Sequence, residues 1–152
     1  MCMMLYVGTA TPLPLVSSPE LRVEAVPDTR SQVRQWFTQP VVHFIGAHTG
    51  CSCGFPAVIA DTPVEYYEGM PLDSDDRDAD LRSVAALLDL LRQTLRENAL
   101  IELYPIGDGD ESRPPKGHID WPFSELDANR LYFNEGFMHD VRDHHNNGAA
   151  RA

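Results

Sequence analysis

The stretch DADLRSVAALLDLLRQTLREN, residues 78–98, has the residue spacing of an amphipathic α-helix. Its apolar side chains recur at steps of three and four residues, and these share one face: Leu81, Val84, Ala85, Leu88, Leu91 and Leu95. Aspartates gather where the helix dipole is positive, and Arg92 and Arg96 lie near its negative end. We therefore expect a long helix that buries its apolar face against a sheet.

Segments with strand character lie on both sides of this helix in the sequence. They are rich in apolar and β-branched residues or alternate between apolar and polar ones. The predicted strands cover residues 2–7, 21–26, 41–46, 100–106 and 131–141. A short helix is expected over residues 28–36, because Val33 and Trp36 fall at helical spacing and Pro40 follows.

One long helix and one short helix are too few to alternate with these strands in a doubly wound fold. The sequence therefore predicts an α+β fold, with a mixed or antiparallel sheet of about five strands and the long amphipathic helix packed on one face. A chain of 152 residues is expected to form a single domain. That domain should cover residues 1–142, and the small and polar residues 143–152 should form a disordered tail.

The charge and cysteine content restrict the partners and the compartment. The net charge is −11, from 12 basic and 23 acidic residues, which argues against nucleic acid and anionic membrane surfaces as partners. No run of about 18 apolar residues is present, so no membrane-spanning helix is expected. Three cysteines do not pair completely, and the start lacks the basic residues of a secretory signal, so we expect a cytoplasmic protein.

The most distinctive chemistry lies in HTGCSCGF, residues 48–55, directly after the predicted strand 41–46. Cys51 and Cys53 are one residue apart and are flanked by glycines. In extended chain, residues two apart point to the same side, so both sulfurs would be presented together. Such a pair can bind a metal, cycle between thiol and disulfide, or pack as small apolar groups.

A zinc site is the first chemical interpretation of this turn, because zinc takes four tetrahedral ligands from Cys and His. His48 lies three residues before the pair, and Cys2 lies on a predicted strand that could pair beside residues 41–46. The candidate metal ligands are Cys51, Cys53, Cys2 and His48, with His43 as a possible substitute. Reversible thiol redox is the second interpretation, because a disulfide within so small a ring is strained and easily reduced.

Two other classes of function stay open at this point. In the first, the cysteines are buried and structural, and the protein is a non-catalytic binding or scaffold module that contacts partners near Tyr66 and Tyr67. In the second, removal of Met1 makes Cys2 an N-terminal nucleophile with its α-amine as the base. The opening MCMMLYVG resembles the first strand of N-terminal-cysteine hydrolases such as glutamine amidotransferases, although the chain is short for their four-layer architecture.

A wider resemblance rests on three segments: Met1-Cys2, the predicted strand 41–46 and the turn HTGCSCGF. Together they resemble small uncharacterised bacterial proteins with a cysteine near the start and an H-x-G-C-x-C-G-F core. The resemblance implies a bacterial source and one compact domain. It implies no activity, so whether the chain is an enzyme stays open.

Overall fold

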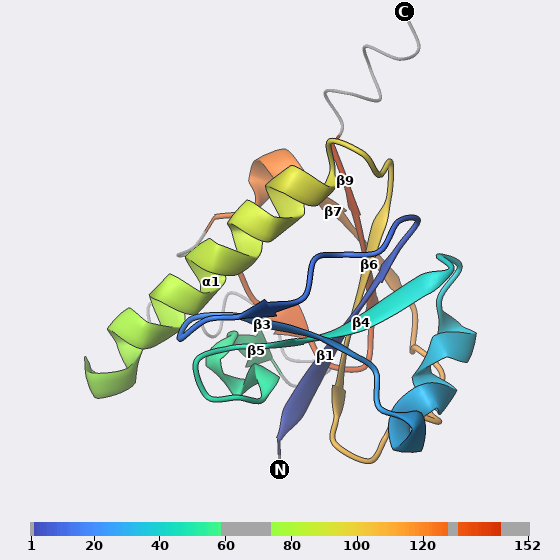
Figure 1. Ribbon diagram of the computed structural model, residues 1–152, viewed down its shortest axis with the longest axis horizontal. Coiled ribbons are helices and arrows are strands. Elements are labelled where there is room, and N and C mark those ends of the chain that lie inside the picture. The colour runs from blue at the N-terminus through green and yellow to red at the C-terminus, as the bar shows by residue number, and fades with distance from the viewer. Residues whose placement is uncertain (1, 59–73, 128–130, 144–152) are drawn as a thin grey trace, which may run out of the picture.

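The computed structural model describes residues 2–58, 74–127 and 131–143. Its strands are β1 (Met3–Thr9), β2 (Val16–Ser17), β3 (Arg22–Ala25), β4 (Val41–Gly46), β5 (Ala57–Val58), β6 (Ile101–Gly107), β7 (His118–Pro122), β8 (Phe133–Asn134) and β9 (Met138–Arg142). Seven of them form a mixed sheet in the order β2-β3-β4-β1-β6-β9-β7, and β5 pairs with β8 in a second sheet (Figure 1). The predicted α+β domain with a long helix is confirmed, with more strands than expected.

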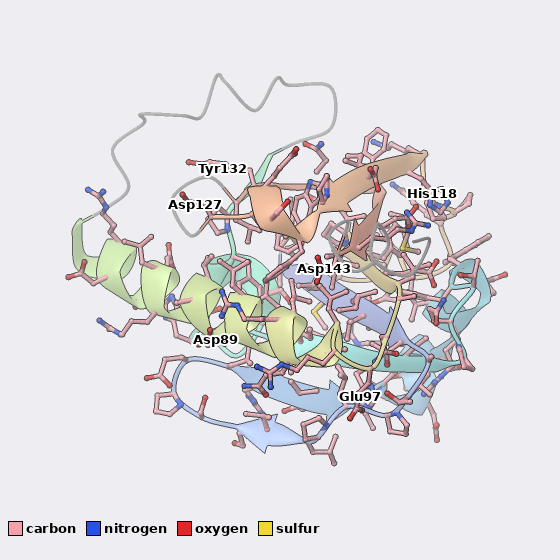
Figure 2. The ribbon with its side chains drawn as sticks, turned by 90° about the horizontal axis from the view of Figure 1, so that it is seen from above. Asp89, Glu97, His118, Asp127, Tyr132 and Asp143 are labelled. Carbon is pink, nitrogen blue, oxygen red and sulfur yellow. The ribbon has the colours of Figure 1, made fainter. Side chains whose placement is uncertain are left out.

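Helix α1 (Ser74–Thr94) packs its apolar face on one side of the seven-stranded sheet (Figure 1). Val84, Leu87 and Leu91 are fully buried there, in one cluster with core residues of β1, β4 and β6. The prediction that Ala85 faces inward is wrong, because the buried stripe is turned toward Leu87 and away from Ala85, which is exposed. The opposite side of α1 is charged, as Asp89 in Figure 2 illustrates.

Strand β1 is central and pairs antiparallel with β4 on one side and β6 on the other. Its alternating side chains serve two cores: Leu5 and Val7 join the α1 cluster, whereas Tyr6 joins a second cluster on the other face. The 3₁₀ helix η1 (Asp28–Trp36) covers that second face and buries Val33 in it. Burial on both faces explains why β1 and β6 are apolar along almost their whole length.

Three strands have no signal in the sequence: β2, β5 and β7. Strands β2 and β5 have two residues each, and β7 is half exposed and ends at Pro122, so none of them shows a clear apolar alternation. Strand β7 runs parallel to β9 and makes the sheet mixed. The predicted strand 131–141 is divided into β8 and β9 by a turn in which Gly136 has a φ of 90°.

Several sequence-based expectations fall on residues 59–73 and 144–152, which lie outside the described residues. These include the aromatic pair Tyr66 and Tyr67 and almost all of the predicted tail. Within the described ranges, no helix has both the length and the apolar character that a membrane crossing requires.

Candidate metal centre

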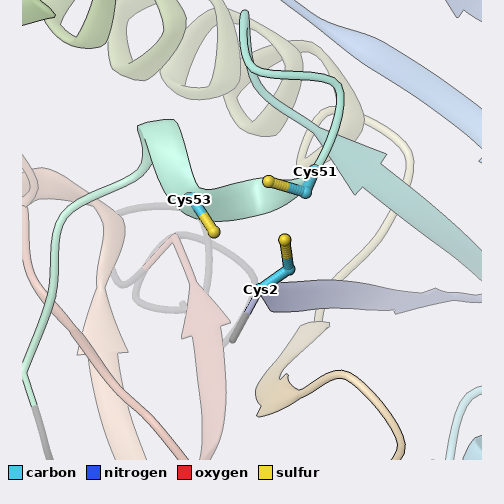
Figure 3. Close-up of side chains that lie close together, drawn as sticks. All are labelled: Cys2, Cys51 and Cys53. Atoms are coloured by element: carbon cyan, nitrogen blue, oxygen red, sulfur yellow. The ribbon is translucent and has the colours of Figure 1, made fainter.

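The three cysteines converge at one corner of the fold (Figure 3). Cys2 immediately precedes β1, and Cys51 and Cys53 lie on the turn that follows β4 and contains the short 3₁₀ helix η2 (Ser52–Gly54). Their Sγ atoms all lie within 4.8 Å of one another. All three are free thiols. The sequence-based expectation that Cys2 reaches the turn is confirmed, because β1 and β4 are neighbours in the sheet.

Backbone hydrogen bonds and two glycines shape the turn that carries Cys51 and Cys53. Ala47 N–H donates to the Cys51 carbonyl (2.8 Å), and Gly50 N–H donates to the Ala47 carbonyl (3.0 Å). Gly50 has a φ of +85°, in the left-handed region that glycine adopts without strain. A Cβ on Gly46 would lie 2.6 Å from the Gly50 carbonyl oxygen, so the close approach of the two segments requires glycine there as well.

The residue between the two cysteines fixes the turn to the sheet. Ser52 is fully buried. Its Oγ accepts a hydrogen bond from Leu5 N–H (2.7 Å) and donates one to the Ile45 carbonyl (2.6 Å). Leu5 and Ile45 are the partners at one end of the β1–β4 ladder, so the hydroxyl bridges the two strands at the point where the chain leaves β4. The serine therefore sets the position of both neighbouring thiols.

Cys2 is held from both sides. Its carbonyl accepts a hydrogen bond from Asp108 N–H (2.8 Å), in the turn that follows β6. The next residue, Met3, donates its N–H to Cys53 Sγ (3.2 Å), which ties the start of β1 directly to the second thiol of the turn. Hydrogen bonds thus fix the backbone of both segments that carry the three sulfurs, the start of β1 and the turn after β4.

The thiols are accessible. Cys2 and Cys53 are exposed, and Cys51 is half-buried. This exposure does not fit the interpretation in which the cysteines are buried apolar groups that fill the turn. The glycine-rich turn is closed by backbone hydrogen bonds and by Ser52, so the sulfurs are not needed to fill its interior.

The neighbouring groups give Cys51 and Cys53 unequal acidity. Burial opposes ionisation of Cys51, but hydrogen bonds from the Thr49 hydroxyl, the Cys53 backbone and the other two thiols stabilise its thiolate and lower its pKa to about 7. Although Cys53 is exposed overall, partial desolvation by burial raises its pKa to about 11. The nearby Cys51 thiolate adds to this effect. About half of the Cys51 thiols are therefore ionised at pH 7.

Alkylation should detect this difference. Because the thiolate is the nucleophile, the rate at which iodoacetamide modifies Cys51 should rise through a midpoint near pH 7 and then level off. Cys53 should react later, with a rate that is still rising at pH 9. Mass spectrometry of peptides after timed labelling gives each rate separately. A midpoint for Cys51 at or above the ordinary thiol value of about 8.5 would contradict the lowered pKa.

The structure does not bring His48 to the sulfurs. Its Nε2 lies 2.6 Å from Asp80 Oδ1, and its backbone N–H donates to Ser83 Oγ (3.0 Å), so both contacts hold it against α1. The ring also lies over Gly54, where a Cβ would come within 2.9 Å of it. His43, the proposed substitute, is buried on β4 and pairs with Val7. His48 contacts residues of α1 that are more than 30 positions away in the sequence. The sequence around the turn therefore does not reveal this contact.

Three thiols at this separation lie close enough to hold a metal ion. With a Zn–S bond of about 2.3 Å and tetrahedral angles, the sulfurs of a zinc site are about 3.8 Å apart. The spacing of up to 4.8 Å therefore needs only a small inward rotation of the side chains. No described His, Asp or Glu places a ligand atom within the same 4.8 Å of all three sulfurs, so the described residues supply three of the four tetrahedral positions.

The architecture does not support the N-terminal-hydrolase alternative. Those enzymes have a four-layer architecture, whereas the described residues form a seven-stranded sheet with α1 on one face and η1 on the other, and a small two-stranded sheet of β5 and β8. The resemblance of residues 1–8 to their first strand therefore extends to one strand only.

Comparison of the chain with protein-family models, with curated proteins and with solved structures finds no match. The geometry of the three cysteines is therefore the feature of the chain that points to a function.

Two of the three glycines with positive φ, Gly50 and Gly136, allow the role of the turn to be tested. Alanine at either position should destabilise the protein by about 1–2 kcal/mol, because both require a left-handed backbone. Only Gly50→Ala should also weaken metal binding, since Gly136 lies in the turn between β8 and β9, where its backbone hydrogen-bonds to Pro105 and Lys116. Thermal unfolding and zinc titration of both variants measure the two effects. Equal loss of zinc affinity in both would contradict this role of the turn.

Proposed function

We propose that this protein binds a metal ion through the thiolates of Cys2, Cys51 and Cys53, with zinc as the first ion to test. The observation that carries the proposal is the convergence of three free sulfurs within 4.8 Å at an accessible corner. Thiolates are the ligands that zinc and other soft or borderline metals prefer. A reducing compartment, in which the thiols stay free, is part of the same proposal.

Three protein ligands and an open fourth position favour reversible binding over a purely structural role. Structural zinc sites are usually closed by four protein ligands, whereas sites with three keep a position for water or another ligand. The exposure of Cys2 and Cys53 leaves the centre open to exchange with solution. The hydrogen-bonded turn and the anchored start of β1 hold the ligands before the ion arrives, which reduces the entropic cost of binding.

Zinc binding is tested by elemental analysis and by titration. The full chain should be purified without chelators and without an N-terminal tag, because an extension at Met1 would lie next to Cys2. A phosphine reductant keeps the thiols reduced and does not compete strongly for zinc. We expect one zinc per chain, released when the three cysteines are alkylated. Metal-free protein that also fails to take up added zinc would contradict the proposal.

Thiol redox is a second candidate, favoured specifically by the Cys51 thiolate beside two further thiols. In this reaction the thiolate attacks a small-molecule disulfide, one thiol leaves, and Cys2 or Cys53 then displaces the second to form an internal disulfide. The protein loses two protons and two electrons, which the small disulfide takes up as it is reduced to two thiols. Incubation with oxidised glutathione followed by thiol titration distinguishes the candidates: a fall from three free thiols to one, reversed by reductant, supports redox cycling.

A further inference from the structure

The centre offers three sulfurs and no fourth described ligand. The nearest candidate in the sequence, His48, is held by Asp80 and Ser83 of α1. No described carboxylate or imidazole joins the group within 4.8 Å of the sulfurs. On the described residues alone, a divalent ion such as zinc would complete its shell from solution, whereas an ion that needs only three sulfur bonds would be satisfied by the three cysteines.

We propose that the triangle formed by Cys2, Cys51 and Cys53 takes trivalent thiophilic ions of the arsenite class, bound through three sulfur bonds. This inference rests on the proposed metal function of the same three residues. Trivalent arsenic forms a pyramid with three sulfurs, and its lone pair occupies the fourth direction. The number of ligands and the open side of the centre both fit this geometry.

The arrangement of the backbone favours simultaneous contact with all three sulfurs. Cys51 and Cys53 flank Ser52, whose hydroxyl is bonded to Leu5 and Ile45, so the two thiols of the turn have a fixed separation. Cys2 approaches from β1, and Figure 3 shows its sulfur directed toward the two others. The exposed thiols of Cys2 and Cys53 leave a path from solution to the centre.

The binding step is balanced without an oxidant or reductant. Arsenous acid exchanges its three hydroxyl groups for the three cysteine sulfurs: three As–O bonds break, three As–S bonds form, and each thiol proton leaves with a hydroxyl as water. Arsenic stays trivalent, and binding to three protonated thiols leaves the charge of the protein unchanged. Zinc bound by three thiolates instead leaves a net charge of −1 at the centre, in a chain that already carries −11.

The test uses the reduced full chain with sodium arsenite as the probe. Native mass spectrometry should show the gain of one arsenic atom and the loss of three hydrogen atoms, and thiol titration should fall from three to none. In competition, arsenite should displace zinc from the protein. Each single Cys→Ser variant should lose more affinity than the about 10- to 100-fold typical of outer-shell changes. His48→Gln is the matched control and should bind as the wild type does.

The outcomes separate this inference from the proposed function. Protein that binds zinc through the three cysteines but keeps all three thiols titratable in arsenite overturns the inference and leaves the metal function standing. Protein that binds neither ion overturns both. Arsenite affinity that is unchanged in Cys2→Ser shows two-sulfur binding by the turn alone and also overturns the inference. If a serine variant fails to fold, the wild-type protein provides the test through the number of thiols consumed per arsenic atom. Three thiols per atom support the inference, and two overturn it.

Discussion

Replacement of Cys51 by serine should weaken zinc binding by about 100- to 1000-fold. Zinc sites with four protein ligands contribute about 10–16 kcal/mol of apparent binding free energy, so one thiolate accounts for roughly 2.5–4 kcal/mol. Serine keeps the size of the side chain but is a poor zinc ligand at neutral pH. Cys2→Ser and Cys53→Ser should have effects of similar size, because all three sulfurs belong to one group. Competition with a colorimetric zinc chelator measures the affinities.

His48→Gln is the control for this comparison. Glutamine can still hydrogen-bond to Asp80, and His48 lies outside the group of sulfurs, so zinc affinity should stay within about threefold of wild type, or roughly 0.6 kcal/mol. A large loss in His48→Gln would show that the histidine leaves α1 to complete the zinc shell. Unchanged affinity in Cys2→Ser would remove β1 from the centre and reduce it to the two thiols of the turn.

Replacement of Ser52 by alanine should cost about 2–4 kcal/mol of unfolding free energy. The change leaves the Leu5 N–H and the Ile45 carbonyl without their partner in a fully buried position, and each orphaned group costs about 1–3 kcal/mol. Because Ser52 lies between Cys51 and Cys53, the same variant should also weaken zinc binding although it removes no ligand. Urea unfolding and zinc competition measure the two effects.

Ser124→Ala is the matched control for Ser52→Ala. Ser124 is exposed in the short 3₁₀ helix η4 (Phe123–Glu125), and the same chemical change there should alter the stability by less than about 0.5 kcal/mol. A comparable small effect for Ser52→Ala would mean that water or a backbone shift replaces the hydroxyl, and the turn would then be held by its backbone hydrogen bonds alone.

Much of the fold was predictable because it depends on local pattern. The apolar stripe of residues 78–98 predicted α1, and the apolar runs predicted β1, β4 and β6 near their observed bounds. Strand β7 was not predictable, because its half-exposed sequence pairs with β9 only through contacts far along the chain. The register of a helix on a sheet is equally non-local, which is why Ala85 was assigned to the wrong face.

The candidate site divides in the same way. The same-side presentation of Cys51 and Cys53 follows from strand geometry, and the arrival of Cys2 follows from the pairing of β1 with β4. The exclusion of His48 depends on where α1 presents Asp80 and Ser83, which no local pattern reveals. Ser52 went unnoticed because a serine in a glycine-rich turn is ordinary. Only its burial and its hydrogen bonds to β1 and β4 show that it fixes the turn to the sheet.

The hydrogen bond from Met3 to Cys53 joins positions 50 residues apart in the sequence, at the point where the central strand begins. An ion held by the sulfurs would link the start of β1 to the turn that carries Cys53 a second time, and this link would be reversible. Occupancy and folding would then be linked, because any ligand that binds only the native chain stabilises it in proportion to the logarithm of its concentration. The concentration of the free ion would thereby set the free energy of unfolding.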